Sequence, residues 1–280
     1  MPRLMTDRVC AVTGATSGIG RAVAFRLADL GATLVLAVRD PEKGEATRTA
    51  ITERTGASAD VIPLDLASLR STRAFSERLT DRYPKLHVLV NNAGIFTRNR
   101  SVTEDGLESQ FQVNYLGHFL LTHLLDDALR AGAPSRIVNV SSEAHQGAGI
   151  DFHDLQGQAR YSGYGAYGQS KLAQILYTHE LARQLAGTGI TVNAVHPGVI
   201  HTNLGRGEYP RAFDVVRHLL KGPDKGARTP VYVATSPALE GVTGRYFKDS
   251  REARSSPESY DDAAARRLWE VSLRLAGLGS

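Results

Sequence analysis

A tyrosine and a lysine stand four positions apart at the two ends of Tyr167-Gly168-Gln169-Ser170-Lys171. The apolar residues that follow repeat with helical period, so this stretch opens a predicted helix. Positions four apart share one helix face, about 6 Å apart at Cβ, and both side chains therefore point into one site. A phenol with a pKa near ~10 is a poor acid at neutral pH, and a fixed cation beside it eases release of its proton. The pair is suited to reversible proton transfer to a carbonyl oxygen. For an isolated pair, the alternative is a packed tyrosine beside a solvated lysine.

A glycine-rich turn lies near the amino terminus. The apolar run Val9-Cys10-Ala11-Val12 leads into it, and apolar residues of helical period follow it. Its G-x-x-x-G-x-G spacing allows a tight backbone turn and close approach to a pyrophosphate, which the positive end of the next helix attracts. A glycine-rich turn without a ligand is the alternative. We expect a dinucleotide to contact Gly14, Thr16, Ser17, Gly18, Ile19 and Gly20.

The second apolar run, Thr33 to Val38, ends at Arg39-Asp40. This end of the second strand reads the adenosine ribose of a dinucleotide. Val38 cannot accept from a free 2′-hydroxyl, whereas the guanidinium fork of Arg39 suits a 2′-phosphate. The sequence favours NADP (NADPH) over NAD. Lys43 is either a second cation for the phosphate or an exposed helix residue. The alternative is that Arg39 is a surface residue that starts the next loop.

Two further strand ends carry polar residues. A third predicted strand and its exit, Val61 to Leu66, place Asp65 to accept from an adenine amino group or to cap the helix that starts near Ser68. The fourth predicted strand, Leu86 to Val90, ends in an N-N-A-G segment, where small residues and amides let a cofactor lie close, although a simple turn also explains it. The expected cofactor contacts here are Asp65, Leu66, Asn92, Ala93 and Gly94.

The middle of the chain offers an amide and two hydroxyls. Asn114 lies within a long helical pattern from Glu104 to Ala131, so its amide must bond either a bent helix backbone or a water. A fifth predicted strand, Arg136 to Val140, leads to Ser141-Ser142, whose hydroxyls suit an N-cap, a turn or donation to a substrate oxygen. The polar stretch from Gly147 to Ser162 is expected to be a loop over the site.

The last third of the chain supplies another strand and its turn. The sixth predicted strand, Ile190 to Val195, is followed by a proline and a glycine that set a rigid turn beside the nicotinamide. The expected cofactor contacts are Pro197, Gly198, Val199 and Thr202. We predict a flap over residues 203–221, a helix over Pro223 to Thr235, a short strand over Gly244 to Phe247, and an amphipathic helix over 259–275.

Composition narrows the class of protein. The 280 residues carry 33 Lys and Arg against 29 Asp and Glu, without a basic run interleaved with aromatics, so nucleic acid is not an expected partner. A single cysteine, Cys10, suits a reducing compartment, and no apolar stretch reaches the length of a signal peptide or a membrane span. We therefore expect a cytoplasmic protein without a membrane anchor. The histidines show no metal-ligand spacing, and no metal is expected.

Strands and helices alternate from end to end, without a linker or an internal repeat. In order, Thr13 to Gly20, Asn91 to Gly94, Asn114, Ser142, Tyr167 with Lys171, and Pro197-Gly198 resemble the short-chain dehydrogenase/reductase family. Segments 37–40, 113–119, 136–142 and 241–247 are similar to its retinol dehydrogenase and WW-domain oxidoreductase branch. The resemblance implies one α/β Rossmann domain over 1–280, with a doubly wound parallel sheet of about seven strands and helices on both faces.

The resemblance also implies roles for single residues. Tyr167 is then the general acid or base, Lys171 lowers its pKa and bonds the nicotinamide ribose, Ser142 polarises the substrate carbonyl, and Asn114 holds a relay water. Ser141 is the alternative to Ser142, and His145 either lines the substrate pocket or is structural. We expect an NADP-dependent oxidoreductase acting on an alcohol and its carbonyl, with a silent dinucleotide-sensing regulator as the alternative.

The same resemblance suggests a homodimer or homotetramer formed through the Tyr167 helix. The charged helix predicted over 259–275 is the competing feature, because it can cover that face.

Overall fold

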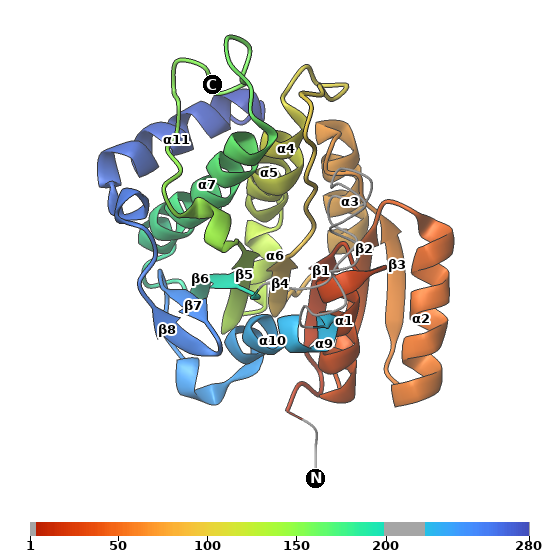
Figure 1. Ribbon diagram of the computed structural model, residues 1–280. Coiled ribbons are helices and arrows are strands. Elements are labelled where there is room, and N and C mark those ends of the chain that lie inside the picture. The colour runs from red at the N-terminus through yellow and green to blue at the C-terminus, as the bar shows by residue number, and fades with distance from the viewer. Residues whose placement is uncertain (1–3, 199–221, 280) are drawn as a thin grey trace.

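The computed structural model describes residues 4–198 and 222–279, which form an eight-stranded sheet in the order β3-β2-β1-β4-β5-β6-β7-β8 (Figure 1). Neighbouring strands from β3 to β7 pair in parallel, and β8 closes one edge as an antiparallel hairpin with β7. The strands are β1 (Val9–Thr13), β2 (Thr33–Val38), β3 (Ala59–Pro63), β4 (Val88–Asn91), β5 (Ser135–Val140), β6 (Ile190–His196), β7 (Tyr246–Lys248) and β8 (Arg251–Ala253). The predicted α/β sheet is confirmed. The additional strand is β8, whose three residues are too short to give a periodic signal.

The sheet order reverses at β1, which lies between β2 and β4. The connections from β1 run outward in both directions, so a crevice opens at the carboxyl ends of these strands, where ligands bind in open α/β sheets.

Two layers of helices cover the sheet, and Figure 1 shows α7 and α11 above it and α1, α9 and α10 below it. One layer contains α3 (Leu69–Arg82), α5 (Gly117–Leu124), α6 (Asp126–Ala131), α7 (Gly163–Gln184) and α11 (Asp262–Leu275). The other contains α1 (Gly18–Asp29), α2 (Pro41–Thr55), α9 (Pro223–Gly226) and α10 (Arg228–Thr235). No described helix has both the length and the apolar character needed to cross a membrane.

The strands are apolar on both faces because each face is covered. In β1, Cys10 and Val12 pack toward α1, whereas Ala11 between them packs toward the α5 and α7 layer. This alternation explains the unbroken apolar runs of the sequence. Cys10 is fully buried and free, and burial raises the pKa of its thiol to about 12, which makes it inert.

The predicted helix over Glu104 to Ala131 is wrong in its continuity. The segment contains α4 (Ser109–Phe111), a π-helix (Gln112–Leu116), α5 and α6. Helical structure begins only at Ser109 because the Glu108 carboxylate accepts from the backbone N–H groups of Gln110 and Phe111. Apolar periodicity alone cannot register such a cap, and it cannot register the extra residue of a π-helix turn.

Other helix and strand boundaries differ from the predicted ones. The third strand, predicted together with its exit over Val61 to Leu66, is β3, which begins at Ala59 and ends at Pro63. The helix over 223–235 is divided into α9 and α10, and the C-terminal helix begins after Asp261, which caps it. The short last strand begins at Tyr246. The predicted flap over 203–221 lies outside the described residues.

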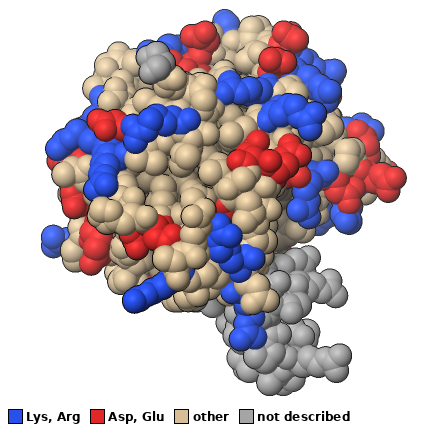
Figure 2. All heavy atoms as spheres, turned by 90° about the horizontal axis from the view of Figure 1, so that it is seen from above, with Lys and Arg blue, Asp and Glu red and all other residues tan. Residues whose placement is uncertain are grey.

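On the face seen from the side of α7 and α11, charged side chains lie mostly around a large uncharged area. Figure 2 shows Lys and Arg intermixed with Asp and Glu there. This mixture agrees with the dispersed charge of the sequence.

Candidate functional site

The predicted site residues meet at the carboxyl edge of the sheet. β1, β4, β5 and β6 end there, and they deliver the glycine turn, the N-N-A-G segment, the paired serines and the Pro197-Gly198 turn. Helix α7 starts beside these ends, with the Ser162 hydroxyl capping the N–H of Gly165 at 3.3 Å. Tyr167 and Lys171 lie in its first turns. Val199 and Thr202 lie outside the described residues.

Lys171 is buried, with 4% of its surface exposed. Its Nζ donates to the Val140 carbonyl at 3.0 Å and to Gln174 Oε1 at 3.1 Å, and it lies 5.6 Å from the centroid of the Tyr167 ring. Desolvation lowers the pKa of Lys171 to about 7. The amine and the phenol share one site, and the charge of the amine is sensitive to a ligand that brings negative charge.

The Tyr167 ring is half-buried between the amine and an aromatic neighbour. Phe96, from the segment after β4, meets it edge to face, with ring centroids 5.7 Å apart. Such a contact fixes the plane of the ring without using its hydroxyl. Tyr164, one turn earlier on the same helix, is 66% exposed.

The two serines after β5 have different surroundings. Ser141 is buried, and its hydroxyl donates to the Lys171 carbonyl at 2.8 Å. Ser142 is half-buried, and its Oγ accepts from the Ala144 N–H at 3.2 Å. The Ser141 proton is therefore committed to the backbone of α7, whereas the Ser142 proton remains to be donated. This geometry favours Ser142 as the donor to a substrate.

His145 contacts the backbone of Ser142. It is completely buried, its Nε2 accepts from the Ser256 N–H at 3.1 Å, and its Nδ1 lies 2.5 Å from the Ser142 carbonyl. Because Nε2 accepts, Nδ1 carries the proton and donates to that carbonyl. Of the two roles considered for His145, the contacts are those of the structural one.

Asn114 lies in the π-helix and is completely buried. Its Oδ1 accepts from the Ile95 N–H at 2.7 Å, and its Nδ2 donates to the Ile95 carbonyl at 3.1 Å and to Ser170 Oγ at 3.0 Å. The amide therefore bonds the segment after β4 rather than its own helix, an arrangement that neither sequence-based alternative included. It ties that segment to α7 three residues after Tyr167.

The absence of a side chain at Gly94 leaves space at this site. A Cβ added there would lie 3.2 Å from Asn114 Oδ1 and 3.6 Å from Lys171 Nζ. The amide and the amine thus face the same point of backbone, where a small residue leaves room for a ligand.

The glycine turn has the shape predicted for a pyrophosphate cradle. Gly14 and Gly18 have φ angles of 69° and 54°, and a Cβ on Gly20 would lie 2.4 Å from the Gly14 carbonyl oxygen. Ser17 precedes α1 without a side-chain cap, as is also the case at α5, α6, α9 and α10, whereas α2, α3, α7 and α11 are capped. The N–H groups at the start of α1 are not bonded by the Ser17 side chain, and together with the glycine turn they could bind an anion.

Thr13 connects the glycine turn to the N-N-A-G segment. Its Oγ1 accepts from the N–H groups of Asn92 and Ala93, both at 2.9 Å, and its carbonyl accepts from Asn92 Nδ2 at 2.9 Å. Asn91 is buried and bonds Asn139 Oδ1 at 2.9 Å. The segment is thus a scaffold joining three strands, and no sequence pattern had indicated this role for Thr13.

Arg39 follows β2 as an exposed side chain and has no ion pair within the described residues. Asp40 caps α2 through the Lys43 N–H at 3.2 Å, and its carboxylate lies 2.7 Å from Lys43 Nζ. Arg39 is therefore available to an incoming phosphate, while Lys43 already has a partner.

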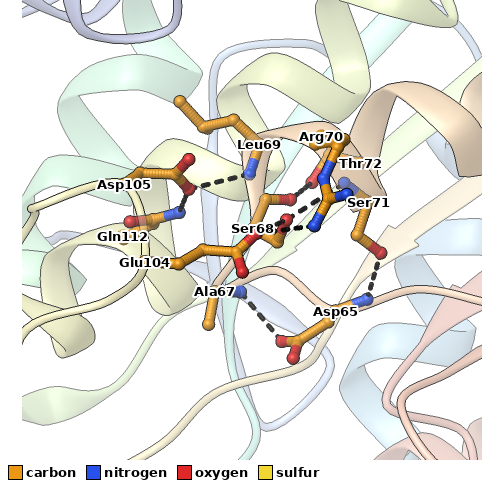
Figure 3. A network of polar contacts seen from close by, with 10 residues as sticks. All are labelled: Asp65, Ala67, Ser68, Leu69, Arg70, Ser71, Thr72, Glu104, Asp105 and Gln112. Atoms are coloured by element: carbon orange, nitrogen blue, oxygen red, sulfur yellow. Dashed lines mark hydrogen bonds and ion pairs between the residues drawn. The ribbon is translucent and has the colours of Figure 1, made fainter.

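Asp65 belongs to a polar network at the start of α3 (Figure 3). Its Oδ1 accepts from the Ala67 N–H at 3.0 Å, while the cap of α3 is Ser68, whose Oγ accepts from the Ser71 N–H at 3.2 Å. The prediction of Asp65 as N-cap is wrong, because its own turn to Ala67 puts Ser68 in that position. Leu66 beside it is buried and lies under Gly117, where a Cβ would approach the Leu66 carbonyl oxygen to 3.0 Å.

The same network reaches the π-helix. Asp105 accepts from the Leu69 N–H at 2.9 Å and from Gln112 Nε2 at 2.6 Å, and Glu104 accepts from the Ser68 hydroxyl. Figure 3 shows these carboxylates converging on the start of α3 from the loop that precedes α4. They orient the segment that carries Asn114.

A separate cavity of about 550 Å³ opens at the amino ends of the strands, lined by Arg8, His87 and Arg136 among others. None of the predicted site residues lines it. The carboxyl edge, where phenol, amine, hydroxyl and glycine turn converge, is the candidate active site.

Comparison with known proteins gives the family. The family model for short chain dehydrogenase matches residues 8–211. Retinol dehydrogenase 14 of Mus musculus is 45% identical over 294 residues, covering 99% of this chain and 88% of that protein. Retinol dehydrogenase 13 of Homo sapiens is 46% identical over 277 residues, covering 95% and 84%.

Solved structures agree. A crystal structure of an uncharacterized protein from Mycobacterium paratuberculosis is 35% identical, with a TM-score of 0.79 and coverage of 97% of this chain and 94% of that chain. A short chain dehydrogenase from Shigella flexneri complexed with NADP is 26% identical, with a TM-score of 0.74 and coverage of 90% and 100%. The chain belongs to the short-chain dehydrogenase/reductase family of oxidoreductases.

Proposed function

We propose that this oxidoreductase uses NADP(H) to interconvert an apolar alcohol with its aldehyde or ketone. The observation that carries the proposal is the buried Lys171 amine, 5.6 Å from the Tyr167 ring, at an edge that also presents the Ser142 hydroxyl. A buried amine is costly to desolvate, so its place beside a phenol favours acid–base chemistry.

The residues present suit a nicotinamide dinucleotide. The uncapped start of α1 suits the pyrophosphate, Arg39 suits a 2′-phosphate, and the space at Gly94 admits the ribose near Lys171. When bound, the dinucleotide supplies or accepts the hydride. We propose Gly14, Thr16, Ser17, Gly18, Ile19, Gly20, Arg39, Asp65, Leu66, Asn92, Ala93, Gly94, Tyr167, Lys171, Pro197, Gly198, Val199 and Thr202 as its contacts.

In the direction of reduction, Tyr167 donates its phenolic proton to the carbonyl oxygen, and Ser142 donates a hydrogen bond to the same oxygen. Lys171 in its ammonium form stabilises the phenolate that remains. Negative charge on a bound dinucleotide favours this form, because it offsets the burial that lowers the pKa of Lys171. Asn114 holds the segment after β4, and we assign the relay water to it as well.

The names of the relatives support the proposed substrate class. The curated proteins of about 45% identity are named retinol dehydrogenases, which act on a long apolar primary alcohol. We propose a substrate of that character, an apolar primary or secondary alcohol, for this chain.

The direct test is Tyr167→Phe, measured by NADPH absorbance on a carbonyl substrate that the wild type reduces. Loss of the general acid is expected to lower kcat by about 10²- to 10⁴-fold, because the ring remains and only the proton is lost. Tyr164→Phe is the matched control: it removes a phenol on the same helix that lacks a lysine four residues later, and it should leave kcat unchanged.

Wild-type turnover by Tyr167→Phe would refute the mechanism. Binding of dinucleotide by the wild type without turnover of any carbonyl or alcohol in a broad panel would instead favour the regulatory alternative.

The cofactor preference is tested separately. Arg39→Ala is expected to weaken NADP binding by about 10- to 100-fold and to leave NAD binding nearly unchanged, because only the 2′-phosphate loses its partner. Titration of both dinucleotides against both proteins measures this. A wild type that binds NAD more tightly than NADP contradicts the preference.

A further inference from the structure

His118 lies on the first turn of α5, and only 2% of its surface is exposed. Both of its ring nitrogens have a hydrogen-bond partner. Its Nε2 lies 2.9 Å from Thr13 Oγ1, and its Nδ1 lies 3.1 Å from the Asn114 carbonyl oxygen. One imidazole therefore spans the distance between the start of the glycine turn and the π-helix.

The surroundings of Thr13 determine where the imidazole proton lies. Thr13 Oγ1 accepts from two backbone donors, Asn92 N–H and Ala93 N–H, and these occupy both of its lone pairs. Its own proton must be donated, and the nearest acceptor is His118 Nε2 at 2.9 Å, whereas the Val90 carbonyl is 3.4 Å away. Nε2 is then an acceptor, and the proton of the ring is on Nδ1.

This tautomer aims an N–H at Asn114. The bonds form a directional chain from the N–H groups of Asn92 and Ala93 to the Thr13 hydroxyl, to His118, and to the Asn114 carbonyl. Burial lowers the pKa of His118 to about 4, so the ring stays neutral at physiological pH and the chain keeps its direction.

The imidazole reaches a carbonyl of the π-helix. In this helix the backbone bonds run to the fifth residue back, as the bond from the Gly117 N–H to the Gln112 carbonyl shows. The His118 ring gives the Asn114 carbonyl of the same turn a side-chain partner. The two Nδ2 protons of Asn114 are donated to the Ile95 carbonyl and to Ser170, and its Oδ1 accepts from the Ile95 N–H.

We propose that His118 is a positioning residue of the reaction: its Nδ1–H holds the Asn114 carbonyl while its Nε2 anchors that hold to Thr13, beneath the dinucleotide. The proposal rests on the proposed function, since it assigns Asn114 to the proton relay.

Two substitutions separate the bonds of His118. His118→Phe fills the space without either bond, whereas His118→Asn places an amide nitrogen at the level of Nδ1 and keeps the donor to Asn114. His123→Phe is the matched control, because His123 is an exposed histidine on the same helix that stacks on Phe119.

We expect His118→Phe to lower kcat by about 10- to 100-fold with less than about a threefold change in KM for NADPH, because a displaced relay group affects proton transfer rather than binding. The solvent deuterium isotope effect on kcat should rise in this variant. His118→Asn should recover most of the loss, and His123→Phe should behave as wild type.

A wild-type kcat in folded His118→Phe overturns the proposal. So does an equal loss in the Phe and Asn variants that follows their melting temperatures, since that is the behaviour of a purely structural residue. Nitrogen-15 NMR of the imidazole is independent of activity: a proton on Nε2, or titration of the ring near neutral pH, also overturns it. An inactive wild type with the Nδ1–H tautomer refutes the proposed function and not the arrangement.

Discussion

At the scale of single residues, the sequence indicated which groups converge but not what each one bonds. The Tyr167 and Lys171 pair was predictable because helical spacing fixes it. The distinction between Ser141 and Ser142 depends on which hydroxyl reaches the Lys171 carbonyl, a contact between residues 30 positions apart. His118 carried no signal, because a histidine among apolar helix positions has the same pattern whether it bridges two elements or fills the core.

The buried amine of Lys171 predicts a dependence of stability on pH in the unliganded protein. The pKa of Lys171 is about 7 when folded and 10.5 as a free side chain, so between these values the unfolded chain binds more protons. Stability therefore rises with pH in this window. Relative to Lys171→Met, the wild type should gain about 2 kcal/mol in free energy of unfolding from about pH 7 to about pH 9.

Urea unfolding of both proteins at the two pH values, without dinucleotide, measures this gain. Parallel pH dependence of the two proteins would show that the amine is charged and solvated, contrary to the structure.

At the scale of elements, the strand-turn-helix order was predictable and the internal breaks of helices were not. Glycine, strand length and apolar period locate β1, the glycine turn and α1 from local sequence alone. The prediction of one continuous helix from Glu104 to Ala131 was wrong. The boundaries of the helices there depend on the Glu108 cap and on the hydrogen bonds of Asn114 and His118. Such bonds come from distant parts of the chain.

The glycine turn itself gives a prediction at this scale. Gly20→Ala should lower dinucleotide affinity by about 10- to 100-fold, because its Cβ would lie 2.4 Å from the Gly14 carbonyl oxygen and displace the turn. Gly132→Ala is the matched control, with a Cβ 2.2 Å from the Leu86 carbonyl oxygen at the opposite edge of the sheet. Both variants should lose stability, and fluorescence titration with NADPH should show weaker binding only for Gly20→Ala. Equal affinity of the two variants would refute the cradle.

At the scale of the whole molecule, α11 covers the outer face of α5 and α7. Trp269 stacks on Tyr177 at 5.9 Å between centroids and meets Phe119 edge to face at 5.2 Å, and the Tyr115 hydroxyl lies 2.8 Å from Ser272 Oγ. The sequence predicted an amphipathic helix here but not which surface it covers. Its position on α7 is the competing feature weighed against assembly through that helix.

This cover should be a main source of stability. Trp269→Ala is expected to lower the free energy of unfolding by about 2 to 4 kcal/mol, through loss of aromatic contacts that no neighbour can replace. Asp262→Ala removes an exposed ion pair to Arg183 between the same helices, leaves the pairing of Arg183 with Glu180 in place, and should cost less than about 1 kcal/mol. Urea unfolding distinguishes the two variants, and a Trp269→Ala variant as stable as Asp262→Ala would mean that α11 is loosely attached.

The most direct measurement follows hydride transfer from NADPH to the substrate in the presence and absence of the Tyr167 hydroxyl. NADPH with deuterium at both hydrogen positions of C4 of the nicotinamide is mixed with the enzyme and an apolar aldehyde, and the mass of the alcohol is determined for wild type, Tyr167→Phe and Tyr164→Phe. The account predicts deuterium in the alcohol at equal rates for wild type and Tyr164→Phe, and almost none with Tyr167→Phe. An alcohol without deuterium, or deuterium transfer by Tyr167→Phe at the wild-type rate, would contradict it.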